Sequence, residues 1–325
     1  MNLTRRAVIS SAIFSAAGLP QMARALEEKY PTRPIRIIVP FAAGGETDYL
    51  PRLVGQYFAE SNGVPFVIEN RTGGGSVIGI DAGAKAAADG YTLTVVTNAF
   101  AVNQSLRASL PYNMLADFVP ITRLATSPHV LVVSSSFKAS TLAELNQLAK
   151  SEKNLSFASV GVGSIAQLEG EKLKREWGVD LVHIPHRGTA PALTDIPANN
   201  ITMMFAALPP LMPLLQSGQL KPLVVTGHVR DSLIPDTPTM IESGFPDFVF
   251  ESWYGLIAPR QTPSEYRAKL NSEVRRILGI PSVIAKLREQ GFSPSGESAE
   301  EFQSFINDEV GKYQKLIDDI GIPKE

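Results

Sequence analysis

Short apolar runs alternate along this chain with amphipathic helical patterns, and this alternation is the strongest constraint on its fold. Residues 35–41, IRIIVPF, are apolar and largely β-branched apart from Arg36, which is typical of a strand buried on both faces of a parallel sheet. After the turn AAGGE, a helix is expected to begin near Thr47, so that Pro51 falls early in it, and to stop at Gly63. Its apolar face consists of Leu50, Leu53, Val54, Tyr57 and Phe58. A predicted βαβαβ layer is completed by strands at residues 65–70 and 91–97 and a helix at 76–88.

The second half of the chain repeats this alternation with different residues, so two sheets are predicted. Thr141 with Glu144, and Ser164 with Gln167, have the spacing of capping boxes that mark helix starts. No Gly/Ser linker is present, so the chain is expected to pass between the sheets as strands, near residues 120–128 and 251–255. The further predicted elements are strands at 129–135, 155–160, 180–185, 201–208, 220–227 and 248–259, and helices at 141–152, 164–178, 262–279 and 298–321.

Charge and cysteine content exclude several functions. Thirty Lys and Arg against 32 Asp and Glu give a net charge of −2 with no basic block, so no nucleic-acid partner is expected. The absence of Cys excludes disulfides, thiol nucleophiles and Cys-ligated metal sites. The signature motifs of zinc proteases, Walker-type nucleotide sites and serine hydrolases are also missing from the sequence. We therefore predict no metal, no cofactor and no catalytic residue.

Residues 1–25 have the pattern of an export signal. A basic start and an apolar stretch at residues 7–19 precede a small-x-small cleavage site that ends at Ala25. The triplet Thr4-Arg5-Arg6 also fits the opening of a twin-arginine motif, so the twin-arginine and the general export routes both stay open. No other stretch reaches about 18 consecutive apolar residues. The mature chain, residues 26–325, is expected to be a soluble periplasmic protein.

The histidines are interpreted as structural. His183 and His186 are three residues apart, but Pro185 lies between them in a strand that runs into a loop, which does not favour a metal site. His129 and His228 have no acid nearby in the sequence to orient them.

Two glycine turns are candidates for anion binding. A turn that leads into a helix presents backbone N–H groups and the positive end of the helix dipole to an anion. The segments FAAGGETD at residues 41–48 and GVGSIA at 161–166 are such turns, and together they could hold both ends of a carboxylic acid. Each could also be no more than a tight turn. The second matches the dinucleotide fingerprint G-x-G-x-x-A, although the next strand lacks the acid that usually accompanies it, so a dinucleotide-binding enzyme remains an alternative.

Six segments resemble a known family in the same order along almost the whole mature chain. They are YPTRPIRIIVPFAAGGETD, PFVIENRTGGGSVIG, AAADGYTL, LSFASVGVGS, VHIPHRGTAPALTD and ESWYGLIAP. They resemble the Bug-type periplasmic substrate-binding proteins, the receptors of tripartite tricarboxylate transporters. The resemblance implies an α/β protein with the type II periplasmic-binding fold, in which two Rossmann-like lobes enclose a ligand cleft. Lobe 1 would comprise residues 26–124 and 251–325, and lobe 2 residues 125–250.

The function implied by the resemblance is that of a receptor. Such a protein is not an enzyme; it binds a small carboxylate without a cofactor and delivers it to a membrane permease, and we expect it to be a monomer. The family holds its ligands chiefly through backbone amides and ordered water at two facing loops. The corresponding positions here are Phe41, Ala42, Ala43, Gly44, Gly45, Thr47, Asp48, Thr97 and Asn98 in the first lobe, and Val160, Gly161, Gly163 and Ser164 in the second.

Three departures from the family pattern bear on the ligand. Family members commonly carry Tyr-Lys where this chain has His186-Arg187, Asp where it has Ala206, and Ser-His where it has Ala166-Gln167. One acid fewer and more potential positive charge favour a di- or tricarboxylate or an aromatic acid over an amino acid. The indole of Trp253 could stack on an aromatic ligand, although core packing is the favoured interpretation. A receptor domain that feeds a sensor kinase is a further alternative.

Overall fold

The computed structural model describes residues 30–186, 188–322 and 324. The predicted export signal, residues 1–25, and the predicted ligand residue Arg187 therefore lie outside the described residues. Residues 31–325 form a unit of their own. Among the helices of its described residues, none combines the length and the apolarity that a membrane span requires.

The first sheet, sheet A, is built around a buried central strand. β1 (Ile35–Val39) lies between β2 (Phe66–Asn70) and β3 (Thr92–Thr97), and both neighbours run parallel to it. The apolar side chains of β1 are fully buried, as its β-branched run predicts. α1 (Glu46–Asn62) connects β1 to β2, and α2 (Val77–Ala84) connects β2 to β3. α1 begins one residue before the predicted start and ends at Gly63, whose φ of 71° suits a glycine.

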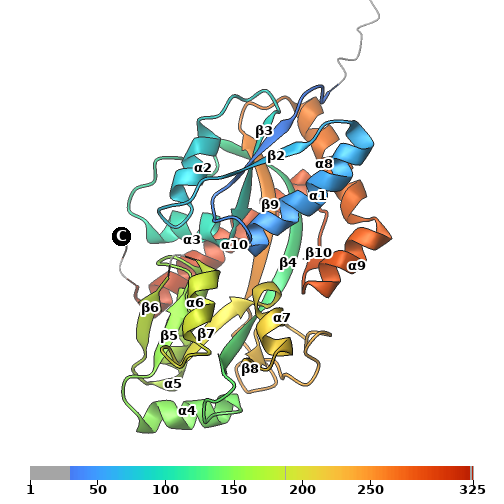
Figure 1. Ribbon diagram of the computed structural model, residues 1–325. Helices are drawn as coiled ribbons and strands as arrows, with labels where there is room; N and C mark the ends of the chain where they lie inside the picture. The colour runs from blue at the N-terminus through green and yellow to red at the C-terminus, as the bar shows by residue number, and fades with distance from the viewer. Residues whose placement is uncertain (1–29, 187, 323, 325) are drawn as a thin grey trace, which may run out of the picture. The chain divides into compact units, whose positions relative to one another are not determined.

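β4 (Phe118–Ser134) belongs to both sheets, as Figure 1 shows. Up to Pro128 it pairs antiparallel with β9 (Glu251–Pro259), and the short β10 (Ser293–Pro294) pairs on its other edge. From His129 onward it pairs with two strands of the second sheet. β9 in turn pairs with β3. The sequence predicted a crossing strand near residues 120–128 and a strand at 129–135, and the structure joins the two into one continuous strand.

The second sheet, sheet B, repeats the arrangement of the first. β5 (Ser156–Ser159) lies between β6 (Val182–Pro185) and β7 (Met203–Ala207), again with parallel neighbours. β7 and β8 (Leu220–Val225) both pair antiparallel with β4. The helices of this half are α4 (Leu142–Ser151), α5 (Ile165–Trp177), α6 (Thr189–Asp195) and α7 (Leu208–Gln216).

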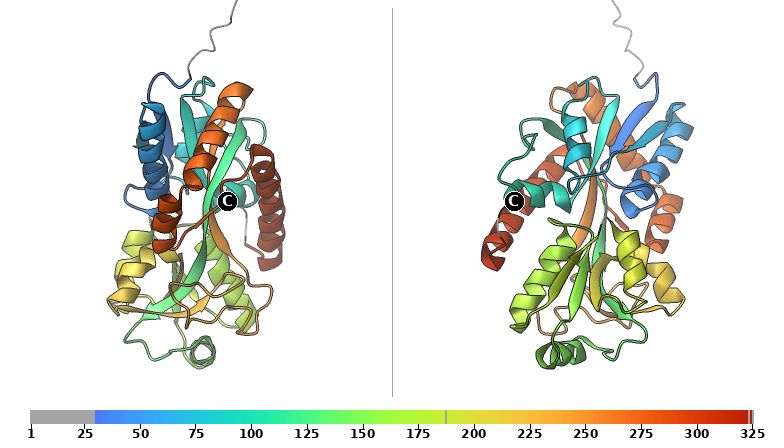
Figure 2. Two further views of the ribbon diagram at one scale, coloured as in Figure 1. Left: turned by 90° about the vertical axis from the view of Figure 1, so that its right-hand side faces the viewer. Right: turned by 60° about the vertical axis from the view of Figure 1, so that its left-hand side comes forward.

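The remaining helices cover sheet A and its junction with sheet B. They are α3 (Asn98–Leu106), α8 (Ser264–Leu278), α9 (Pro281–Glu289) and α10 (Ala299–Ile320). α10 packs against α3, β4 and α5, and so contacts elements of both halves (Figure 2). α10 starts with a capping box in which Ser298 accepts from the Glu301 amide, while the Glu301 carboxylate accepts from the Ser298 amide.

The helices α3, α6, α7 and α9 were not predicted from the sequence. α3 follows β3 without an intervening glycine, and α7 contains three prolines, two of which lie at its start, where proline is tolerated. The predicted lobe boundaries at residues 124/125 and 250/251 stay a prediction. In the structure, β4 changes partners between Pro128 and His129, and β9 begins at Glu251.

Candidate functional site

Each sheet has one place where its strand order reverses. The chain runs from β1 outward to β2 and then returns to the other side of β1 at β3. In sheet B it runs from β5 outward to β6 and returns to the other side of β5 at β7. Ligands of open α/β sheets bind outside the carboxyl ends of strands at such switch points. The predicted site residues lie at or after the ends of β1, β3, β5 and β6, or near the end of β7.

The two switch points face each other along β4. Thr97, the last residue of β3, is level with Tyr254 of β9, which is paired with Ala125 of β4. Ala207, the last residue of β7, is paired with His129 of β4. β3 runs in the same direction as β4 and β7 runs opposite to it, so their carboxyl ends point toward each other. Ala125 and His129 are four residue steps apart along β4, which is about 13 Å of strand.

The turn after β1 is organised by Asp48. Its side chain is buried, and it accepts hydrogen bonds from the Gly44 amide at 3.0 Å and from Asn70 Nδ2 at 3.0 Å. Arg52 donates to both of its carboxylate oxygens, at 2.8 and 3.0 Å. Burial alone would raise the pKa of Asp48, but these hydrogen bonds lower it below its ordinary value. Asp48 thus holds the turn in shape with an ionised carboxylate that is already neutralised by Arg52.

The other predicted residues of this turn differ in exposure. Ala42, Ala43 and Gly44 are exposed, Phe41 and Gly45 are half-buried, and Thr47 is buried. Gly45 precedes α1 without providing a side-chain cap. Because no side chain of its N-cap residue occupies the start of α1, the N–H groups there suit an anion.

Thr97 and Asn98 stand at the end of β3 but have different surroundings. The Thr97 hydroxyl caps α3 by accepting from the Ala99 amide. Asn98 is buried and joins three elements: its Nδ2 donates to the Glu251 carbonyl at 2.9 Å and to the Tyr313 hydroxyl at 2.7 Å, and its Oδ1 accepts from the Trp253 amide at 3.1 Å. The side chain of Asn98 is thus used within the protein. A contact between Asn98 and a ligand stays a prediction.

The turn after β5 has a tight internal network. Gly161 has a φ of 129° and Gly163 a φ of 79°, conformations that favour glycine. The Gly161 amide donates to Ser159 Oγ, and the Gly163 amide donates to Gln167 Oε1 at 2.8 Å. Ser164 caps α5 by accepting from the Gln167 amide, so the predicted capping pair is present with its return bond shifted to Gly163. The amides of Gly161 and Gly163 are therefore bonded within the turn itself.

The predicted residues beyond this turn are divided between surface and core. Val160 is half-buried, and His186 binds Asp195 at 2.8 Å through Nε2. Ala206 is buried in an apolar cluster with Val130 and Val132 of β4. His183 Nε2 lies 2.7 Å from Ser159 Oγ, so His183 and His186 have different hydrogen-bond partners. In the described part of the chain, no group of three acidic or histidine side chains could hold a metal ion.

A glycine loop that sequence reasoning did not assign to the site connects the two halves. A Cβ added to Gly75 would lie 3.4 Å from the Val162 carbonyl oxygen, and one added to Gly163 would lie 3.1 Å from Leu106. Asn103 of α3 donates to the Gly75 carbonyl at 2.9 Å. The loop between β2 and α2, together with α3, thus contacts the turn after β5. The sequence signal for this loop was the triple glycine of residues 73–75. In the structure, Ser76 follows these glycines with a positive φ of 83°.

Three buried side chains form a chain of hydrogen bonds between the facing strand ends. His129 Nδ1 lies 2.6 Å from Glu169 Oε2 on α5, and His129 Nε2 lies 2.7 Å from Ser252 Oγ on β9. Burial raises the pKa of Glu169 despite the nearby histidine. Burial likewise raises the pKa of Glu46 at the start of α1, and His129 partly offsets this shift.

His129 was interpreted as structural because no acid lies near it in the sequence. Its partners are in fact 40 and 123 residues away, and only the fold brings them to it. The Ser-His-Glu order resembles that of a hydrolase triad, but all three side chains are buried. In this position the chain of bonds joins both crossing strands to α5. Trp253 is also buried, with Nε1 donating to Glu309 Oε2 at 2.9 Å, in agreement with its interpretation as a core residue.

The facing switch points on two linked α/β sheets define the fold of periplasmic binding proteins, as solved structures of such proteins confirm. The sequence model of the tripartite tricarboxylate transporter family receptor, TctC, matches residues 50–322, and the chain belongs to this family. Protein BugT of Bordetella pertussis is 33% identical over 324 residues, 99% of each chain. The family consists of solute-binding receptors, so the resemblance seen in the sequence is confirmed.

Two solved structures are similar over most of this chain. R. palustris Rpa4515 with adipate is 34% identical, with a TM-score of 0.87, and the match covers 90% of this chain and 99% of that one. MatC (Rpa3494) from Rhodopseudomonas palustris with bound malate is 31% identical, with a TM-score of 0.82, over 89% of this chain and 100% of that one.

Proposed function

We propose that this protein is a periplasmic receptor that captures a small di- or tricarboxylate, or an aromatic acid, between its two facing switch points and delivers it to a tripartite tricarboxylate transporter permease. The observation that carries the proposal is the opposition of the carboxyl ends of β3 and β7 across residues 125–129 of β4. Family membership and the adipate and malate of two relatives support the ligand class. Residues 1–25 would export the chain.

Backbone groups suit this ligand class better than charged side chains do. The residues that precede α1 and α2, Gly45 and Ser76, give no side-chain cap to these helices. Uncapped helix starts favour anions through their N–H groups and dipoles. Glu46 stands at the first of these starts, where burial raises its pKa. A protonated Glu46 would donate a hydrogen bond to a carboxylate, whereas an ionised one would repel it.

The test is thermal unfolding of the protein with adipate, malate, citrate, benzoate and the dinucleotides NAD and NADP, followed by calorimetric titration of any acid that raises the midpoint. Adipamide is the matched uncharged control for adipate. A ligand at 100 times its dissociation constant should add about 2.7 kcal/mol. We expect at least one acid to stabilise the protein and to be recovered unchanged, with adipamide inactive. If only a dinucleotide stabilises the protein, or if the acid is chemically converted, the receptor proposal is wrong.

The sequence-based expectation for Arg187 has its own measurement. Arg187→Ala should weaken the acid found in this screen by more than about 1 kcal/mol if the guanidinium contacts the anion. Arg230→Ala is the matched control, because the exposed Arg230 lies in the half of the molecule that contains sheet B and binds Glu242 at 2.9 Å. Equal affinities of the two variants would remove Arg187 from the site. Co-purification of the ligand-loaded protein with its permease tests delivery.

A further inference from the structure

The helix α5 carries the turn after β5 rigidly at its start. Ser164 caps the helix and donates its hydroxyl to the Gly161 carbonyl at 2.6 Å. The Gly163 amide donates to Gln167 Oε1, in the first turn of the helix, at 2.8 Å. These bonds join the turn to the helix, so a shift of α5 moves the turn with it. Whatever fixes α5 relative to the crossing strands β4 and β9 therefore also fixes this turn.

Glu169, in the next turn of α5, connects the helix to β4. Its side chain is fully buried, and its Oε2 lies 2.6 Å from His129 Nδ1. Its other carboxylate oxygen is buried without a hydrogen-bond partner among the described residues. Because a buried polar group is costly to leave unpaired, a displacement of α5 that breaks the bond to His129 is strongly disfavoured.

His129 is held by both its backbone and its ring, and it extends the connection to β9. Its amide donates to Thr226 Oγ1 at 3.0 Å, and its Nε2 lies 2.7 Å from Ser252 Oγ on β9. The next residue of β9, Trp253, donates its amide to Asn98 Oδ1 at 3.1 Å, at the carboxyl end of β3. Hydrogen bonds and short stretches of backbone thus join the turn after β5 to the end of β3.

The bond of Glu169 adds precision to the packing of α5. A Cβ added to Gly170 would lie 2.2 Å from Cε2 of the Phe157 ring, so α5 packs closely on β5 of sheet B. α3 and α10 also contact α5. A hydrogen bond differs from such packing because it weakens steeply when its angle is wrong, and so it selects one orientation of the helix.

We propose that Glu169 and His129 are positioning residues for ligand capture: their hydrogen bond holds the turn after β5 where it and the turn after β1 can bind the same carboxylate ligand. Neither side chain needs to contact this ligand. The inference rests on the proposed function, because it assumes that an acid binds between the switch points. Binding groups must be held to within about 0.5 Å, and hydrogen bonds behind them supply such support.

Two substitutions of Glu169 separate the hydrogen bond from the charge. Each variant is titrated calorimetrically with adipate, malate, citrate and benzoate. Glu169→Leu removes the bond and should raise the dissociation constant of any acid that the wild-type protein binds by at least about fivefold. Glu169→Gln keeps an oxygen that accepts from His129 Nδ1, so the dissociation constant should stay within about twofold of the wild-type value.

Ser252→Ala tests the same connection with a smaller change, in case Glu169→Leu does not fold. It removes the hydroxyl that bonds to His129 Nε2 and should weaken acid binding by at least about twofold. The double variant Glu169→Leu, Ser252→Ala should bind no more weakly than Glu169→Leu alone, because both changes break one connection.

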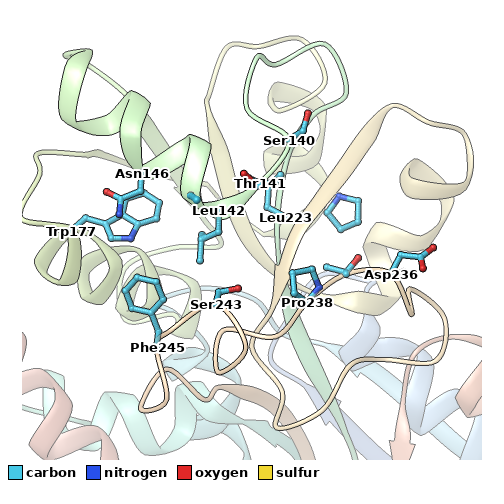
Figure 3. Close-up of a pocket in the computed structure, with 13 residues that line it drawn as sticks. Ser140, Thr141, Leu142, Asn146, Trp177, Leu223, Asp236, Pro238, Ser243 and Phe245 are labelled. Carbon is cyan, nitrogen blue, oxygen red and sulfur yellow. The ribbon is translucent and has the colours of Figure 1, made fainter.

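A destabilising change near the other end of α5 is the matched control. Leu142 of α4 is buried and lines a cavity together with Trp177, the last residue of α5 (Figure 3). Leu142→Ala should lower the unfolding midpoint, because it removes a buried side chain, but should change acid affinity by less than about twofold.

Hydrogen–deuterium exchange of the unliganded protein tests the positioning role without an acid. The Gly163 amide should exchange faster in Glu169→Leu than in the wild type, Glu169→Gln or Leu142→Ala, because the turn is held less firmly. If none of the four acids binds the wild-type protein, the proposed function fails and exchange at Gly163 alone decides the positioning role.

Three results would overturn the positioning proposal. The first is wild-type affinity, or wild-type exchange at Gly163, in Glu169→Leu. The second is a loss in Glu169→Gln as large as that in Glu169→Leu. The third is an equal loss in Leu142→Ala, which would show that general destabilisation is the cause.

Discussion

At the residue scale, Asp48 shows how a negative charge near a proposed anion site can stabilise the protein. Its carboxylate is 3% exposed and is held by Gly44, Arg52 and Asn70. These bonds tie the turn after β1 to the neighbouring strand β2 and to the first turns of α1. Because the negative charge is matched by Arg52, it stabilises the turn without repelling a carboxylate strongly.

Asp48→Asn should reduce the free energy of unfolding at pH 7 by about 1–3 kcal/mol, because it weakens charge-assisted hydrogen bonds to a buried group. The pKa of Asp48 is lowered from 3.8 in the folded protein. Its stabilisation is therefore present above pH 3.8 and is lost as the pH falls through the folded pKa. Urea unfolding at pH 7 and at lower pH measures this, with the exposed Asp308→Asn as control. A gap between wild type and Asp48→Asn that does not narrow in acid would contradict the argument.

At the scale of elements, β9 packs against α10 at a glycine. Gly255 is paired with Val96 of β3 and with Arg123 of β4, so it stands in the middle of three strands. A Cβ on it would lie 2.2 Å from Cζ of the Phe302 ring, closer than atoms can approach. The absence of a side chain is what lets α10 lie close to the crossing strand.

Gly255→Ala should destabilise the protein by about 1–3 kcal/mol through overpacking. Shortening the opposing ring in the double variant Gly255→Ala, Phe302→Leu should recover part of this loss. Gly311→Ala is the matched control, since nothing lies within 4 Å of its Cβ position in α10, and it should be neutral or stabilising by up to about 1 kcal/mol. Chemical denaturation measures all three. Equal losses for the two glycines would mean that close packing at Gly255 is not the cause.

At the scale of the whole molecule, the two sheets share strands and side-chain bonds. β4 pairs in both, α10 packs against elements of both, and His129 binds both α5 and β9. Unfolding either half would break the pairing of β4 and expose the junction. The two halves are therefore expected to lose structure together.

Heating should produce one unfolding transition, with equal calorimetric and van't Hoff enthalpies. Differential scanning calorimetry measures both. Gly255→Ala should move this single transition to lower temperature without splitting it. Two separable transitions would show that the shared strands do not couple the halves.

The alternation of apolar runs and helical patterns was enough to predict the α/β fold and its parallel strands, which the structure confirms. The family was also evident from motifs along the chain. The candidate site was harder to predict from the sequence, and the roles of its residues stay predictions. The glycine turns could be nominated because their conformations need glycine at local positions. The roles of Asn98 and Ala206 could not be foreseen, because their partners on β4, β9 and α10 are distant in sequence.

The sequence by itself determined most of the strands and the longer helices, the exclusion of cysteine chemistry and the family, because these depend on local patterns and composition. The tertiary structure alone decided what depends on distant pairs. It paired β4 with both sheets, so that the ends of β3 and β7 face each other. It brought Glu169 and Ser252 to His129. It also formed the cavity beside Trp177. Register and packing between separate elements produce these features, and no local pattern encodes them.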